Sequence, residues 1–135
     1  MELACAPKDS PAKSLKWIKC TGELSESEIC EAYFEADGLV FLSLEESYGL
    51  PIVEAMYLGL PIVCPSLAYA EVLCGDEAIY FDPTDIRSLN AAILELERRL
   101  KLGWQPNWND ALKKIPKNWD EVADKILIAI NSKLR

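Results

Sequence analysis

The sequence predicts an α/β fold in which a parallel, doubly wound sheet is flanked by helices. Apolar runs that suit strands alternate with segments of helical periodicity along nearly the whole chain. Two of these runs, 38–44 and 61–65, are apolar almost throughout, as in strands of a parallel sheet that are buried on both faces. Ligands of such a sheet bind at the carboxyl ends of its strands, so we expect a site at that edge.

The N-terminal part predicts short strands and one helix. Residues 2–6 ("ELACA") suit a first strand, and residues 15–20 ("LKWIKC") suit a second one. A helix is expected to follow Ser25, which forms a capping box with Glu28. The apolar residues of this helix recur with a spacing of i, i+3, i+4 and i+7: Ile29, Ala32, Tyr33 and Ala36.

The central part predicts three strands and two helices. After the strand 38–44 and the loop "EESYG", a helix begins near Leu50, with Pro51 in its first turn and Gly59 at its end. The remaining elements are a strand, a short helix and a strand, expected at 61–65, 69–75 and 78–82.

The C-terminal part predicts two helices joined by a loop over 103–117 that contains one helical turn. In the last helix, Asn118 is the expected cap, with Glu121 three residues on. It is expected to bury Val122, Ile126 and Ile130. The preceding helix has one apolar stripe and two i,i+4 ion pairs: Ile86, Leu89, Ile93, Leu96 and Leu100, with Glu95–Arg99 and Glu97–Lys101.

The amino-acid composition limits the classes of function that this chain can have. With 135 residues, half of them apolar, the chain is expected to form a single domain over 1–135. Its net charge of -8 disfavours nucleic acid as a partner, because a phosphate backbone would be repelled. Five cysteines without a CxxC pair and the lack of histidine disfavour a zinc site, a disulfide framework and histidine catalysis. We therefore expect a reducing, cytoplasmic compartment and no zinc site.

The longest apolar stretch, 39–66, is not expected to span a membrane. Three prolines interrupt it, and Glu54 would lie near the bilayer centre, where a charge is costly. Two carboxylates, Glu46 and Glu54, lie in this stretch near the predicted ligand edge. The N–H groups of Gly49 and Leu50, at the start of a helix, suit an anion such as phosphate, and Glu54 suits the vicinal hydroxyls of a sugar.

The same two glutamates also fit an interpretation in which neither of them binds a ligand. Glu46 suits a carboxylate that stabilises a helix N-terminus, and Glu54 suits a solvated helix surface. Their spacing is not informative, because Glu23 and Glu31 show it on an ordinary helical face. The local chemistry leaves both readings open.

The order of motifs resembles the donor-binding C-terminal domain of group 1 glycosyltransferases, family 4 of the GT-B fold. The segments that carry the resemblance are "GELSESEICEAYFEADGLVFLS", "ESYGLPIVEA", "GLPIVCPS", Glu71 and "AIYFDPTD". The resemblance implies a Rossmann-like half-domain that lacks its usual first strand. It implies transfer of a sugar from a nucleoside-diphosphate sugar to an acceptor, with retention and without a required metal.

The resemblance also implies roles for five residues. Glu46, as the catalytic residue, would contact hydroxyls of the donor sugar, and Glu54 would bind the nucleotide ribose. The N–H groups of Tyr48, Gly49 and Leu50 would hold the sugar and the diphosphate. A double displacement with Glu46 as nucleophile is an alternative that fits the family less well. For Glu71, a role at the site and a plain helix N-terminal charge both stay open.

The sequence departs from the family in what it lacks. No N-terminal acceptor domain is evident, nor a basic pair for the diphosphate, for which only Lys8 and Lys13 are candidates. The missing strand would leave a gap in the sheet that residues 2–6, a second chain or self-association would close. The alternative function is a non-catalytic module that binds a nucleotide sugar or a protein, as one half of a split transferase. An epimerase of the same fold fits less well, and the whole enzyme would be cytoplasmic or peripheral to a membrane.

Overall fold

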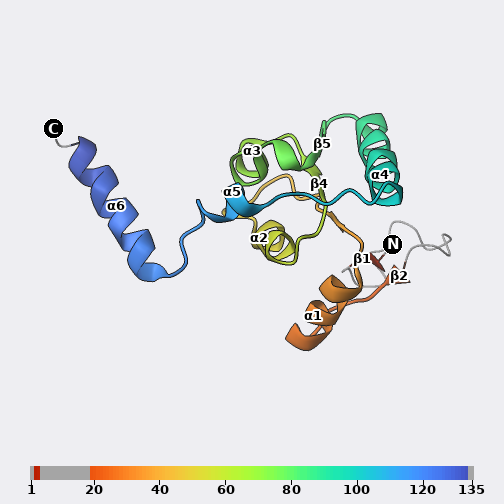
Figure 1. Ribbon diagram of the computed structural model, residues 1–135, viewed down its shortest axis with the longest axis horizontal. Coiled ribbons are helices and arrows are strands. Elements are labelled where there is room, and N and C mark those ends of the chain that lie inside the picture. Colours follow the sequence, from red (N-terminus) through yellow and green to blue (C-terminus); the bar gives the residue numbers. More distant parts are fainter. Residues whose placement is uncertain (1, 4–18, 134–135) are drawn as a thin grey trace. The chain divides into compact units, whose positions relative to one another are not determined.

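The computed structural model describes residues 2–3 and 19–133, and the chain divides into two compact units, 1–36 and 37–135 (Figure 1). In the first unit, β1 (Glu2–Leu3) pairs in parallel with β2 (Lys19–Cys20). The predicted strands 2–6 and 15–20 are confirmed at these four residues. Their other residues, like Lys8 and Lys13, lie outside the described residues. A single domain over 1–135 stays a prediction.

The helix of the first unit, α1 (Glu26–Glu35), begins at the predicted capping box. The Glu28 N–H donates to the Ser25 hydroxyl, and the Ser25 N–H donates to Glu28 Oε2 at 2.8 Å. The Ser25 hydroxyl also donates to Glu28 Oε2, at 2.6 Å. The bonds from this hydroxyl and from the Ser25 N–H lower the pKa of the Glu28 carboxyl, because they favour its charged form. No residue of α1 is buried, and Ile29 of the predicted apolar face is exposed.

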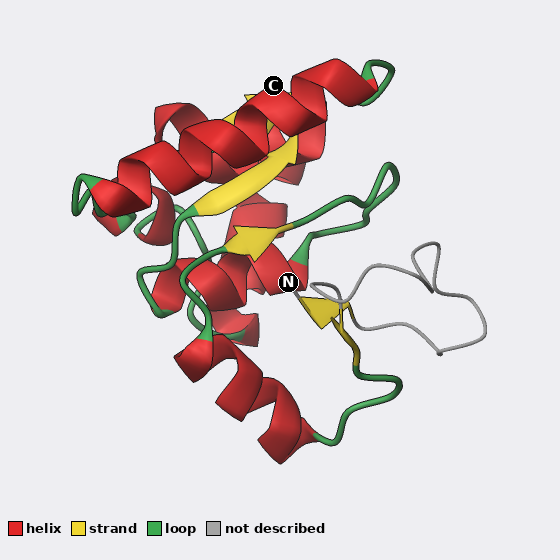
Figure 2. Ribbon diagram, turned by 90° about the vertical axis from the view of Figure 1, so that its right-hand side faces the viewer, coloured by secondary structure: helices red, strands yellow, loops and turns green. Residues whose placement is uncertain are grey.

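The second unit contains a three-stranded parallel sheet in the order β3-β4-β5 (Figure 2). Helices connect its strands, so the predicted α/β class with a Rossmann-like parallel sheet is confirmed. The elements in chain order are β3 (Leu39–Val40), α2 (Leu50–Tyr57), β4 (Ile62–Pro65), α3 (Ala68–Cys74), a 3-10 turn (Gly75–Glu77), β5 (Ile79–Phe81), α4 (Ile86–Lys101), α5 (Asn109–Leu112) and α6 (Trp119–Lys133).

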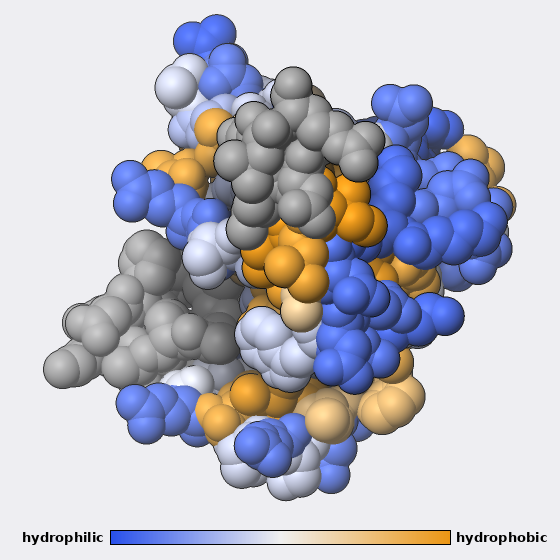
Figure 3. Space-filling model, turned by 90° about the vertical axis from the view of Figure 1, so that its left-hand side faces the viewer, coloured by the Kyte–Doolittle hydropathy of each residue, from blue (hydrophilic) through white to orange (hydrophobic). Residues whose placement is uncertain are grey.

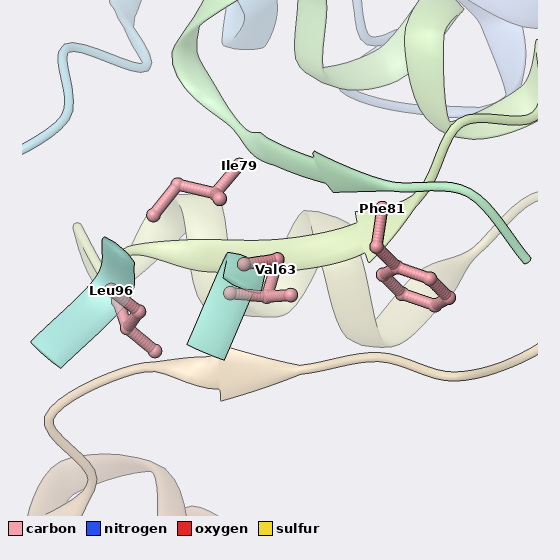
Figure 4. Close-up of a cluster of buried hydrophobic side chains, with 5 residues drawn as sticks. Val63, Ile79, Phe81 and Leu96 are labelled. Carbon is pink, nitrogen blue, oxygen red and sulfur yellow. The ribbon is translucent and has the colours of Figure 1, made fainter. Parts of the chain in front are cut away.

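The core of this unit consists of three layers, with the sheet in the middle. On one face, α4 packs on β4 and β5 through a cluster that includes Val63, Ile79, Phe81 and Leu96 (Figure 4). Because side chains alternate along a strand, Ile62 and Cys64 point to the other face, where α2 and α3 lie (Figure 1). Both residues are fully buried, so β4, the middle strand of this sheet, is covered on both faces, as sequence analysis expected of the run 61–65.

The predicted strand 38–44 is shorter in the structure than expected. Only Leu39 and Val40 form β3, although Phe41 still donates its N–H to the Val63 carbonyl at 2.8 Å. Leu42 and Leu44 are exposed, so the prediction that this run is buried on both faces is wrong at its carboxyl end. The reason is pairing: among the described strands, β3 is an edge strand whose ladder partner is β4 alone.

Helix α4 has the predicted stripe, except at its start. Asp85 caps the helix by accepting the Arg87 N–H at 2.8 Å. Leu96 is buried and Leu89 is partly buried, but Ile86 is 69% exposed, so its predicted place in the packed stripe is wrong. Ile86 lies in the first turn, whereas the side chains that pack on the sheet begin at Leu89 and continue to Leu100.

The predicted ion pairs of α4 are both present. Glu95 accepts from Arg98 and Arg99, each at 2.7 Å, whereas Glu97 and Lys101 are 3.8 Å apart. The hydrogen bonds from Arg98 and Arg99 lower the pKa of Glu95 from 4.5 to about 2. A carboxyl with a lowered folded-state pKa stabilises the fold above its unfolded-state pKa, and this contribution is lost as the pH falls towards 2.

We therefore expect Glu95→Gln to lower the free energy of unfolding slightly at pH 6, where the unpaired amide cannot replace the charge. The difference from the unsubstituted chain should shrink as the pH falls from 4.5 towards 2, measured by urea unfolding of both proteins. Glu97→Gln is the control, and its effect at pH 6 should be smaller because its pair is longer and more exposed. A Glu95→Gln effect that grows towards low pH would contradict this linkage.

The loop after α4 contains the predicted helical turn, α5, and is anchored by Trp108. This tryptophan is buried, and its indole N–H donates to the Leu60 carbonyl at 2.9 Å. The other tryptophan of the loop, Trp104, makes a cation–π contact with Arg99, whose guanidinium carbon lies 4.7 Å from the centroid of the indole ring. Trp108 is thus a packing residue of the second unit.

The last helix, α6, starts as predicted but does not bury its apolar face. The Glu121 N–H donates to Asn118 Oδ1 at 2.9 Å, which confirms the cap. Val122 is partly buried, Ile126 is 54% exposed, and the Ile130 side chain lies outside the described residues, so the predicted burial is wrong at Ile126. Exposed apolar side chains also occur elsewhere on the surface (Figure 3). Among the described helices, none has the length and apolar character needed to cross a membrane.

Candidate functional site

The carboxyl ends of the three parallel strands β3, β4 and β5 meet at one edge of the sheet. The loop that follows β3 carries the predicted site residues and leads into α2. Ser66 follows β4 at the same edge, and its N–H donates to the Phe81 carbonyl at 2.8 Å. The site residues therefore lie where the fold predicts a ligand.

The N-terminus of α2 is built around Gly49. Its backbone is left-handed, with φ 80° and ψ 47°, and its carbonyl accepts the N–H groups of Ile52 at 3.0 Å and Val53 at 3.3 Å. Within the described part of the chain, the N–H groups of Tyr48, Gly49 and Leu50 donate to no acceptor. Three consecutive donors at the positive end of the helix make this segment suited to an anion.

Gly49 is also a point of close approach. A Cβ at this position would lie 3.2 Å from Leu73 Cδ1 and 3.8 Å from Tyr69 Cδ2, both on α3. A side chain at residue 49 would thus meet α3 as well as require an unfavourable backbone conformation. The residue is buried, although its neighbours Tyr48 and Leu50 are exposed.

The two glutamates of the site are both exposed. Glu46 lies in the loop, three residues before Gly49, and Glu54 lies in α2, one turn after Leu50. Residues four apart lie on the same face of a helix, so Glu54 and Leu50 share one face of α2. The structure thus brings Tyr48, Gly49 and Leu50 together at the helix start, with one carboxylate before them and one after.

Tyr69 is a residue of the site region that sequence analysis missed. Its hydroxyl donates to the carbonyl of Ser43, at the start of the loop, and its ring contacts Phe41 edge-on with centroids 6.5 Å apart. Burial raises the pKa of Tyr69, with further contributions from Cys64, Glu46 and Cys74, so its hydroxyl stays protonated. No motif marks this tyrosine in the sequence, because its partner is 26 residues away.

Glu71 takes part in a second contact at this edge. It lies in the first turn of α3, as expected of a helix N-terminal charge, and its Oε1 accepts the Ser66 hydroxyl at 2.6 Å. Ser66 directly follows β4, so this bond ties the start of α3 to the end of the central strand. The geometry supports the structural reading of Glu71.

Two shallow hollows lie away from the predicted residues. One, of about 240 Å³, is lined at the carboxyl end of β5 by residues 81–86 and Leu89. The other, of about 440 Å³, is lined by Asp37, Glu97, Leu100 and Lys101. Neither includes Glu46, Gly49 or Glu54.

The fold and this site define a class of protein: α/β proteins with a Rossmann-like parallel sheet and a helix N-terminus at its ligand edge. Comparison with known families is more specific, since a family model described as glycosyl transferases group 1 matches residues 6–99. This match covers more than half of the chain. The chain belongs to the group 1 glycosyltransferases, which confirms the resemblance in the sequence.

Several curated relatives are mannosyltransferases. The chain is 34% identical over 79 residues to O-antigen chain mannosyltransferase B of Escherichia coli, covering 58% of the chain and 21% of the relative. It is 30% identical over 76 residues to the Salmonella typhimurium O-antigen chain mannosyltransferase RfbU, covering 56% of the chain and 22% of the relative. The chain is 30% identical over 77 residues to the serotype-specific mannosyltransferase WbdA of Escherichia coli, covering 55% of the chain and 9% of the relative. The chain thus spans about a fifth or less of these relatives.

Proposed function

We propose that this chain is the donor-binding part of a glycosyltransferase that transfers a sugar from a nucleoside-diphosphate sugar to an acceptor, with retention of configuration. The observation that carries the proposal is the start of α2, where three N–H groups that have no acceptor among the described residues lie between Glu46 and Glu54. Membership of the group 1 family supports it. Since two relatives are O-antigen chain mannosyltransferases, the proposed sugar is mannose and the proposed acceptor a growing saccharide chain.

In this proposal, the diphosphate of the donor binds the N–H groups of Tyr48, Gly49 and Leu50. Charge grows on this diphosphate as the bond to the sugar breaks, and fixed N–H donors stabilise it most when they are already oriented. The positive end of the α2 dipole acts in the same direction. These donors belong to the chain itself, so the proposal includes no metal ion.

The two carboxylates orient the donor. Glu54, on the face of α2 that begins at Leu50, accepts from the ribose hydroxyls, and Glu46 accepts from hydroxyls of the transferred sugar. In the transfer, the bond from the anomeric carbon to the diphosphate breaks and a bond to the acceptor oxygen forms on the same face. The proton of the acceptor goes to the departing diphosphate.

We propose the cytoplasm as the compartment in which this chain acts.

Two substitutions test the proposed roles. Glu54→Gln should weaken binding of the nucleotide and of its mannose conjugate alike, by about 10-fold or more, because a hydrogen bond to a charged group contributes about 1.5–3 kcal/mol. Glu46→Gln should weaken binding of the mannose conjugate but leave binding of the nucleotide alone unchanged. The measurement is an amide NMR titration with GDP, UDP, ADP and their mannose conjugates.

The control for this titration is Glu31→Gln, which removes an exposed glutamate from α1 and should change no affinity. Equal losses in all three variants would indicate a general charge effect and contradict the assigned roles. If no nucleotide shifts the amides of residues 46–54, the donor-binding proposal is wrong. The alternative, a module that binds a protein partner, would then be favoured.

A further inference from the structure

Tyr69 hydrogen-bonds the start of the loop that carries the proposed donor contacts, and its ring lies near the end of that loop. At the start of the loop, its hydroxyl donates to the Ser43 carbonyl. At the end, its ring lies 3.8 Å from the position that a Cβ on Gly49 would occupy. Glu46 and Tyr48 lie between these two points, so one side chain of α3 spans the segment 43–49.

Among the described residues, the other hydrogen bonds of the segment 43–49 join residues at most four positions apart. Its own side chains contribute a short-range bond, from the Ser43 hydroxyl to the Glu45 carbonyl at 3.0 Å. Residues 44–48 are exposed, and no helix or strand includes them. A loop with little packing of its own orders only if another element fixes it, and ordering it during binding would reduce affinity.

The Tyr69 ring is itself fixed from two sides. Phe41, directly after β3, contacts it edge-on with an interplanar angle of 82°, and the Tyr69 hydroxyl is held by its bond to the Ser43 carbonyl. Burial raises the pKa of the hydroxyl, which keeps the proton that the bond to Ser43 requires. The tyrosine is therefore a rigid donor whose ring is held by the sheet.

We infer that Tyr69 is a positioning residue of the donor site: it fixes residues 43–49 so that Glu46 and the N–H groups at the start of α2 face the donor together. This inference rests on the proposed function for the identity of the ligand. Its structural half, the fixing of the loop, is independent of any ligand. Tyr69 acts through the loop and is not assigned a contact with substrate.

The test compares Tyr69→Phe with Tyr80→Phe. Each removes one tyrosine hydroxyl that donates to backbone carbonyl oxygen, but the acceptors of the Tyr80 hydroxyl are Gly75 at 2.6 Å and Ala70 at 3.5 Å, neither of which belongs to the segment 43–49. The amides of Ile52 and Val53 report on the loop, since both donate to the Gly49 carbonyl. The Leu39 amide, bonded to Pro61 at 2.8 Å, reports on the sheet.

Relative to Leu39, hydrogen exchange at Ile52 and Val53 should become about 3- to 10-fold faster in Tyr69→Phe and stay unchanged in Tyr80→Phe, as expected for loss of one hydrogen bond. Tyr69→Phe should also weaken binding of the best mannose conjugate among those of GDP, UDP and ADP by a similar factor. A purely structural role would weaken binding equally in both variants.

Equal relative exchange in the two variants would overturn the inference. If the unsubstituted chain binds the mannose conjugate, faster exchange at Ile52 and Val53 in Tyr69→Phe with unchanged affinity for the conjugate would also overturn the inference. If the unsubstituted chain binds none of the conjugates, the proposed function fails. The exchange rates then still decide whether Tyr69 fixes the loop, and a loop that is not fixed overturns the inference by itself.

Discussion

Phe81→Ala is expected to lower the free energy of unfolding by about 3–5 kcal/mol, the range for an aromatic side chain removed from a core. Phe81 is 5% exposed and lies in the cluster that joins β4 and β5 to α4 (Figure 4). The loss combines the transfer of the ring to water with the cavity that remains. Because small domains are stable by only about 5–15 kcal/mol, this substitution should leave the second unit barely folded.

Urea unfolding followed by tryptophan fluorescence would measure this loss, since Trp108 is buried in the same unit. The control is Phe34→Ala, which removes the same side chain where it is 76% exposed, and its effect should stay within about 0.5 kcal/mol. Similar losses for the two variants would mean that the α4 cluster does not form in solution.

Gly49→Ala is expected to cost about 2–3 kcal/mol of stability and to weaken donor binding. Part of the cost, about 1–2 kcal/mol, comes from placing an L-residue at φ 80°. The rest comes from the added Cβ, 3.2 Å from Leu73 Cδ1, because the end of the Leu73 side chain must shift by a few tenths of an ångström to admit it. The N–H groups proposed to bind the diphosphate lie at this point, so their geometry should change as well.

Gly59→Ala separates the two causes. Gly59 has a similar backbone conformation, with φ 72°, but no atom lies within 4 Å of its added Cβ. It should lose only the backbone part, about 1–2 kcal/mol, and retain full affinity for the mannose conjugate. Urea unfolding and the NMR titration provide the two measurements. If both variants lose the same stability and the same affinity, the contact with α3 has no role at the site.

Sequence analysis predicted those parts of the site that depend on interactions between residues close together in the sequence. Pro51 indicated the first turn of a helix that begins near Leu50, and the structure confirms this start. The two glutamates were predicted as ligand-facing from the order of strand, loop and helix, and their roles stay predictions. Tyr69 could not be predicted in this way, because its bond to Ser43 spans 26 residues and needs α3 to lie beside the end of β3.

The sequence by itself determined the α/β class, the order of helices and strands in the second unit, and the caps at Ser25 and Asn118. These features depend on hydrogen bonds and side-chain pairs three or four residues apart, which the sequence specifies directly. Only the tertiary structure decided the short length of β3, the exposure of Ile86 and Ile126, and the contact of Tyr69 with the loop. Burial and strand pairing depend on which distant element lies opposite, and the same apolar residue is buried or exposed according to that partner.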